Sequence, residues 1–314
     1  MTRAAAHKWE FKARFRRHAF GWKSQPAIQR VKQATSEIRK VARTDPVLAA
    51  EGAVTLIERL SPAIERVDSS SGAIGTAVNN AIAELVPLIA KAPAGPAMRD
   101  AWLERLWAAH EADEIPYIES LADHWGELCA SKEVASAWAD RLLGITRLAL
   151  SPDKTVRGHF HGTAACLSAL YRAERYPEIV DILKVDTIWP YKCWAVRALA
   201  ATGRKAEAIR YAESCRGRWA DDGEVAATCE EILLSSGMVD EAYERYGLLA
   251  LHWLVLGHGY EITGEDVWAA YSSTMKAAEA NGNAVEVRER IKKLAGDEKP
   301  GGFVSRILGR ELGL

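Results

Sequence analysis

Two segments of the chain carry the same pattern of residues: Gly203-Arg204-Lys205-Ala206-Glu207-Ala208 and Gly237-Met238-Val239-Asp240-Glu241-Ala242. Glycine, glutamate and alanine recur in both at the same offset, which equals the length of a tetratricopeptide unit, about 34 residues. Leu199 and Leu233 precede the two glycines by four positions, so each falls on the first helix of its unit. The pattern predicts helical hairpins that cannot bury their apolar faces alone and must stack on their neighbours.

An imperfect earlier copy of this pattern is Leu170-Tyr171-Arg172-Ala173-Glu174-Arg175-Tyr176-Pro177-Glu178-Ile179. Its Glu178 lies closer in the chain to Glu207 than Glu207 lies to Glu241, so the repeat is degenerate there.

The rest of the chain also has helical periodicity, and no run alternates apolar and polar residues as a half-buried strand does. Breaks fall at residues 44–46, 68–72 and 91–96, and further helices are expected near residues 97–111, 115–129, 133–149 and 155–173. We therefore predict an all-α protein of stacked helical hairpins, an α-solenoid with tetratricopeptide-like repeats in its second half. The expected parts are a basic aromatic arm (1–23), an irregular helical bundle or solenoid (24–152), the repeats (153–250) and a divergent helical tail (251–314).

Three further strings resemble those of an uncharacterised family of bacterial helical-repeat proteins. They are Arg14-Phe15-Arg16-Arg17-His18-Ala19-Phe20-Gly21-Trp22, Val67-Asp68-Ser69-Ser70-Ser71-Gly72-Ala73-Ile74-Gly75 and His159-Phe160-His161-Gly162-Thr163. The resemblance covers roughly residues 12–246 and implies a helical-repeat fold, but no reaction and no catalytic residues. It also implies further repeats after about residue 247, where the chain instead continues as His252-Trp253-Leu254-Val255-Leu256-Gly257.

Charge is distributed unevenly along the chain. Residues 1–44 contain twelve lysines and arginines but only two acidic residues, Glu10 and Glu37, so this stretch carries +10 within a chain whose net charge is −1. The remaining residues therefore carry −11. Hydrophobic residues make up 48% and charged residues 26%, a balance that excludes wholesale disorder and a collagen-like chain.

The N-terminal arm interleaves aromatic rings with cations. Cations neutralise phosphates and aromatic rings stack on unpaired bases, so this composition suits a nucleic-acid interface. It also fits a helix that lies on a membrane or partner surface. The interpretation we favour is that the rings pack the arm onto the acidic body. The candidate binding residues are Lys8, Trp9, Lys12, Arg14, Phe15, Arg16, Arg17, Trp22 and Lys23.

A metal site is the other chemical candidate. His110 and Glu114 have the i, i+4 spacing of metal ligands on a helix, and His124 lies one predicted helix further on. The HExxH motif is absent, and solvated residues at a helix end explain the pattern more simply. His159, His161 and Cys166 are likewise expected to be structural, because the two histidines point to different sides of a helix. We expect no catalytic residue and no cofactor.

The five cysteines form no CxxC pair, which indicates reduced buried thiols rather than a disulfide framework. No apolar run approaches the roughly 18 residues of a membrane-spanning helix, and the basic start lacks the apolar stretch of a secretory signal. We expect a cytoplasmic, non-enzymatic scaffold that binds a protein or peptide on the concave face of its solenoid. The alternatives are a nucleic-acid-associated protein that uses the basic arm, and a metal-dependent enzyme.

Overall fold

The computed structural model describes residues 7–185, 187–217, 222–246, 268, 271–272, 274–276, 278–279, 282, 284–297 and 303–313. Helices, turns and loops account for all of these residues, and none of them lies in a β-strand, so the all-α prediction is confirmed. The chain divides into two compact units, Met1–Val185 and Asp186–Leu314, so the boundary expected at residue 152 lies inside the first unit. Residues 252–257, where the chain departs from the expected repeats, lie outside the described residues.

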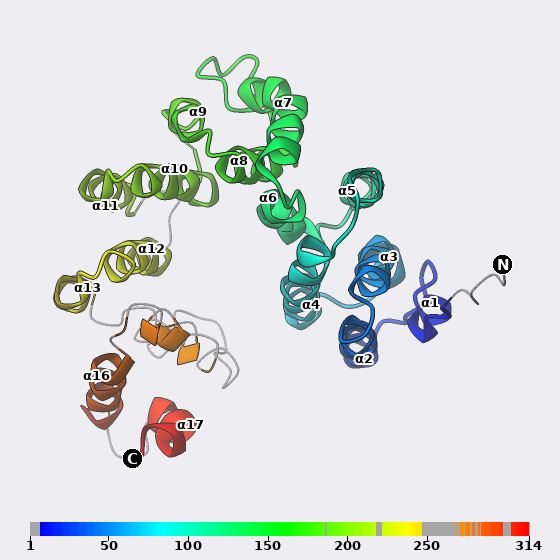
Figure 1. The fold of residues 1–314 in the computed structure, drawn as a ribbon, viewed down its shortest axis with the longest axis horizontal. Coiled ribbons are helices and arrows are strands. Elements are labelled where there is room, and N and C mark those ends of the chain that lie inside the picture. The colour runs from blue at the N-terminus through cyan, green and yellow to red at the C-terminus, as the bar shows by residue number, and fades with distance from the viewer. Residues whose placement is uncertain are drawn as a thin grey trace. The chain divides into compact units, whose positions relative to one another are not determined.

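The first unit is a set of helices built around a three-helix group (Figure 1). Helices α2, α3 and α4 pack against one another, α5 packs on α3, and the η1–α6 segment joins α4 to α8. Helix α8 also carries α7 and α9. The bounds are α1 Glu10–Arg14, α2 Ser24–Ala42, α3 Pro46–Ile64, α4 Ala73–Lys91, α5 Pro96–Glu111, η1 Glu119–His124, α6 Trp125–Leu128, α7 Lys132–Ala149, α8 Thr163–Arg172 and α9 Tyr176–Ile182.

Helix starts follow the local sequence in α3 and depart from it in α4. The Asp45 carboxylate accepts a hydrogen bond from Leu48 N (2.9 Å), and Pro46 occupies the first turn as predicted. Ser71 is well placed in sequence to cap α4, but the residue at the cap position is Gly72, in the left-handed region with φ +72°. A side chain there would be strained, so the turn at residues 68–72 depends on this glycine.

Two predicted helices are shorter than their apolar pattern suggests. Residues 115–129 form a loop, the short 3₁₀ helix η1 and the short helix α6, because Pro116 disfavours a helical Ile115 and the Asp113 carboxylate binds Ile118 N (2.8 Å). Residues 155–162 belong to a loop, and α8 begins only at Thr163. Asp153 stabilises that loop by accepting hydrogen bonds from the backbone and hydroxyl of Thr155.

The expectation that no segment is long and apolar enough to cross a membrane needs a correction at α4. Among the described residues this helix passes that test by length and composition. Its apolar side chains, including Ile82, Leu85 and Ile89, are buried in the packed group with α2 and α3. A core helix accounts for this composition without a membrane.

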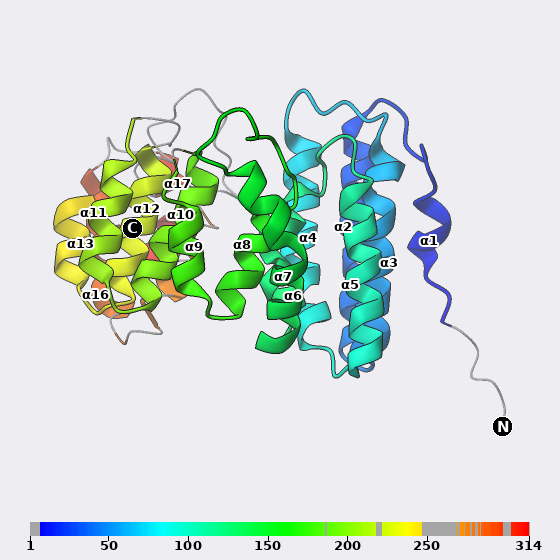
Figure 2. The ribbon, with the colours of Figure 1, turned by 90° about the horizontal axis from the view of Figure 1, so that it is seen from above.

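The second unit contains two described helical hairpins, shown in Figure 2 together with the helices that follow them. Helix α10 packs on α11 and α12 packs on α13, while α12 also contacts both helices of the preceding pair. Helices α16 and α17 pack on each other. The bounds are α10 Trp189–Ala201, α11 Lys205–Ser214, α12 Asp222–Leu234, α13 Val239–Tyr246, α16 Ala284–Asp297 and α17 Phe303–Leu312.

The two copies of the sequence pattern make the same turn. Gly203 and Gly237 both have positive φ, +81° and +72°. The residue after each glycine donates its backbone N–H to the leucine that precedes that glycine by four positions: Arg204 N to Leu199 O and Met238 N to Leu233 O, both at 3.0 Å. This pattern ends a helix by satisfying its last carbonyl groups, and it favours glycine because a left-handed residue without Cβ is unstrained.

The degenerate copy between α8 and α9 makes the same turn without a glycine. Arg175 N donates to Leu170 O (2.9 Å), and Glu174 takes the left-handed position with φ +59°. Arg175 also pairs with Glu178 through two short hydrogen bonds, as Arg204 does with Glu207. The shorter offset of this copy therefore changes the length between turns but not the turn itself.

Exchange of the left-handed residues tests this equivalence. Because the left-handed conformation costs a residue with Cβ about 1–2 kcal/mol, Gly203→Ala should destabilise the second unit by about 1 kcal/mol, and Glu174→Gly should stabilise the first by a similar amount. Denaturant unfolding of each variant measures both changes. Lys132→Ala controls for the exposed Lys132–Glu174 ion pair, which should contribute little. A change of the reverse sign in either variant would contradict the shared turn.

Candidate functional site

The N-terminal arm is docked on the first unit through its aromatic side chains. Trp9, Phe11 and Phe15 are only 7%, 2% and 1% exposed, and their rings form a chain with centroids 5.4 and 6.4 Å apart. The Trp9 ring lies on Gly52 of α3 so closely that a Cβ at Gly52 would come within 2.3 Å of it. The favoured interpretation, that the rings pack the arm onto the body, agrees with this burial.

Polar contacts hold the backbone of the arm in the same place. The Glu37 carboxylate on α2 accepts hydrogen bonds from Glu10 N (2.8 Å) and Phe11 N (3.2 Å), which caps the start of α1 from another helix. Arg59 donates to Phe15 O (3.3 Å), and His18 N donates to Pro62 O (2.8 Å). The chain from residue 9 to residue 18 is therefore part of the folded unit.

The cations of the arm and of α2 remain on the surface. Of the eleven lysines and arginines described in residues 7–44, Arg14, Arg17 and Arg39 pair with Glu10, Glu65 and Glu84. The other eight are exposed and form no ion pair with a described residue: Lys8, Lys12, Arg16, Lys23, Arg30, Lys32, Lys40 and Arg43. The arm therefore docks through its apolar side chains, and its lysines and arginines stay accessible to a ligand.

These positions change the candidate binding set. Burial removes Trp9 and Phe15 as platforms for stacking bases, since neither ring faces solvent. Trp22 is 72% exposed and is the one candidate ring that can stack on a ligand. Phe15 and Trp22 do not share one side of a helix, because α1 ends at Arg14.

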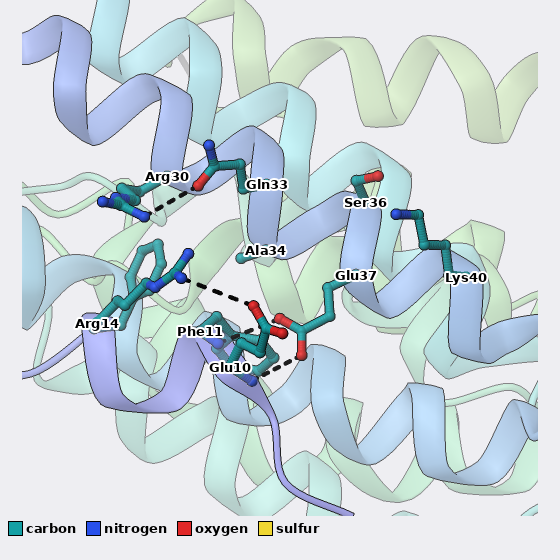
Figure 3. A pocket seen from close by; sticks show the side chains of 10 residues that line it. Glu10, Phe11, Arg14, Arg30, Gln33, Ala34, Ser36, Glu37 and Lys40 are labelled. Atoms are coloured by element: carbon teal, nitrogen blue, oxygen red, sulfur yellow. Dashed lines mark hydrogen bonds and ion pairs between the residues drawn. The ribbon is translucent and has the colours of Figure 1, made fainter.

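A hollow of about 610 Å³ separates α1 from α2 (Figure 3). Phe11, Phe15 and Ala34 are among its lining residues, and Arg14, Arg30 and Lys40 bring positive charge to it. The sequence did not indicate Arg30 or Lys40 as binding residues, because the hollow exists only once α1 packs on α2. The spacing of the α2 cations along a helix is the signal in the sequence from which Arg30 and Lys40 could have been found.

The structure does not bring together His110, Glu114 and His124, the weak candidates for a metal site. His110 is buried and its Nε2 lies 3.3 Å from His161 O, whereas Glu114 is exposed in the loop and His124 faces Glu127. Among the described residues no group of three His, Cys, Asp or Glu side chains could hold a metal ion. The segment that was expected to present His124 on a regular helix is the irregular η1–α6 stretch.

His110 instead belongs to an aromatic cluster in the core. Its ring lies 5.6 Å from Trp107 and 5.5 Å from His161, and Trp107 in turn packs on Trp125 and Trp138. With Nε2 donating to His161 O, the buried Nδ1 has no hydrogen-bond partner among the described residues. Burial lowers the pKa of His110, because the apolar surroundings disfavour the charged ring.

The buried cysteines have the character of small apolar side chains. Burial raises the pKa of Cys129 to about 12 and that of Cys166 to about 11, so both are thiols at neutral pH. A thiol is a weak nucleophile and a poor metal ligand. Cys166 is fully buried in the protein core, as are Leu167 and Leu170 on the same helix, α8.

Comparisons with known proteins add no assignment: no family model, no curated protein and no solved structure matches the chain.

The buried histidine predicts a pH dependence of stability. Because the pKa of His110 is lower in the folded state, its contribution to stability is complete above the unfolded pKa of about 6.5 and declines as the pH falls below it. His110→Phe should abolish this part of the decline in unfolding free energy between pH 7.5 and pH 5. His159→Asn, on the exposed loop, serves as the control. Equal pH dependence in wild type and His110→Phe would refute the assignment.

Proposed function

We propose that the protein is a non-enzymatic scaffold of tetratricopeptide-like repeats, whose second unit binds a protein or peptide partner along the first helices of its hairpins, the concave face of a solenoid. The observation that carries this proposal is a pattern of burial that repeats with the same period as the sequence. The resemblance to bacterial helical-repeat proteins and the expected cytoplasmic location belong to the same proposal.

Burial in α10 and α12 matches over residues 194–199 and 228–233, and it differs at other positions of the two helices, such as buried Trp189 and half-buried Gly223. Trp194, Ala195, Val196, Ala198 and Leu199 are buried in α10, and the residues one period later are buried in α12. Ala208 and Ala242 are fully buried where the second helix of each hairpin approaches the first. Equivalent positions in the two hairpins thus have equivalent packing roles, which supports a structural repeat rather than a coincidental similarity of the two sequences.

The exposed positions repeat as well. The solvent-facing edge of α10 includes Pro190, Arg197 and Ala201, and the corresponding residues of α12 are Glu224, Glu231 and Ser235. Solenoids commonly bind ligands on such rows of first-helix side chains. Arg197 and Glu231 occupy the same position with opposite charge, and Arg197 lies over the Trp194 ring. A partner with complementary charges along an extended segment fits this row.

The first unit contributes less to this proposal. Its α8–α9 hairpin shares the turn, but Ser168, the α8 residue that aligns with Arg197, is buried and donates to Asp123 O. Ser168 Oγ also accepts a hydrogen bond from Gly126 N of α6 (2.9 Å), so another helix covers that edge of α8. The binding row is therefore placed on α10 and α12.

Site-specific photocrosslinking tests the proposal in the native host. A photoreactive residue at position 201, the exposed alanine on the same row, should capture one discrete partner, and Arg197→Glu combined with Glu231→Arg should abolish the crosslink while the circular dichroism is unchanged. The matched control is position 210, an exposed arginine on the second helix α11. Equal capture from position 210, or capture that the charge reversal leaves intact, would count against this surface.

A further inference from the structure

We propose that the basic face of α2 binds single-stranded nucleic acid, with phosphates on Lys23, Arg30 and Lys40 and one base stacked on Trp22. This inference is independent of the partner-binding row on α10 and α12. It also shifts the nucleic-acid site predicted on the arm: Trp22 and Lys23 at the end of the arm remain in it, and Arg30 and Lys40 of α2 replace the candidates nearer the N-terminus.

Lys23, Arg30 and Lys40 lie on one face of α2. Lys23 is the residue before the first turn, and Arg30 and Lys40 follow at spacings that keep all three within about 100° around the axis. At a rise of about 1.5 Å per residue, the row from Lys23 to Lys40 extends over about 26 Å. All three are exposed, and none forms an ion pair with a described residue. The row is therefore long enough for several successive phosphates.

Two carboxylates, Glu37 and Glu10, lie near this row of cations, and each already has a hydrogen-bond or ion-pair partner. Glu37 accepts both backbone N–H groups at the start of α1, and Glu10 pairs with Arg14 at 3.8 Å. In Figure 3 the Glu37 carboxylate points to the start of α1 and the Glu10 carboxylate lies beside Arg14, while Lys40 lines the same hollow from α2. Arg14 offsets the charge of Glu10, and the remaining carboxylate, Glu37, is outnumbered by Lys23, Arg30 and Lys40, so the net charge on this surface is positive and attracts phosphates.

An aromatic ring stands at the end of the row. Trp22 is 72% exposed and directly precedes Lys23, so a base stacked on its indole places the adjoining phosphate beside a cation. Its backbone is fixed, since Trp22 O accepts from Asp68 N (2.8 Å). Stacking on this exposed ring needs an unpaired base, which is why the surface favours single strands over duplexes.

The docking of the arm argues against a membrane as the ligand. A helix that lies in a membrane interface inserts an apolar face. Here the apolar side chains Trp9, Phe11 and Phe15 are buried against the body, and Trp22 is the one large exposed apolar side chain described in residues 7–44. The remaining surface is cationic and polar. An exposed indole next to cations also suits a base and its phosphate better than it suits a segment of an acidic protein.

Fluorescence anisotropy of the full chain with a labelled oligo-dT of about 20 nucleotides tests the proposal across a salt series. The variant Lys23→Gln/Arg30→Gln/Lys40→Gln should bind at least tenfold more weakly, with a salt slope reduced by about 2 because each single-strand phosphate contact contributes about 0.7. The control Lys91→Gln/Lys154→Gln/Arg210→Gln removes the same charge from other exposed positions and should bind as wild type.

The Trp22→Ala variant separates nucleic acid from other polyanions. It should weaken oligo-dT binding about fivefold or more and leave binding to a duplex of the same length unaffected. Equal losses in the two triple variants, or oligo-dT binding insensitive to Trp22→Ala, would overturn the proposal. So would stronger binding to poly-glutamate or to phosphatidylserine vesicles than to oligo-dT at the same salt concentration.

Discussion

Packing of three aromatic side chains from residues 9–15 onto α2 and α3 determines what the N-terminal region can do. The Trp9 ring needs the absence of a side chain at Gly52, and Phe11 and Phe15 continue the contact along the arm. Burial of large rings is among the stronger stabilising contributions in a fold. Once these rings are buried, the same segment has only Ala13 and its charged side chains, Glu10, Lys12 and Arg14, left on the surface.

This arrangement divides the protein into two kinds of surface. The first unit has a docked arm and a row of unpaired cations on α2, whereas the second unit has hairpins whose first helices repeat their exposed positions with the period of the sequence. A polyanion fits the first surface and a protein segment fits the second. In both proposals the surface acts through binding, and neither proposal uses the buried cysteines, which are thiols, or the buried His110.

The sequence predicted the features that depend on local chemistry. The glycines of the repeat mark left-handed turns, and Pro46 marks a helix start, because each imposes its own backbone geometry. Glu174 gives no such signal, since its turn is set by the packing of α8 and α9 rather than by its own preference. The α2 site was likewise hidden: the sequence showed aromatic rings among cations, but only tertiary packing decides which of the two remains exposed.

The free energy of unfolding of Phe15→Ala, measured beside Trp22→Ala, tests the docked arm most directly. The account predicts a loss of about 3 kcal/mol for Phe15→Ala, because it removes a ring from a packed core. For Trp22→Ala it predicts a change within about 0.5 kcal/mol, as for an exposed side chain. If Phe15→Ala left the stability unchanged, the arm would not be docked, and its aromatic rings would be free to bind.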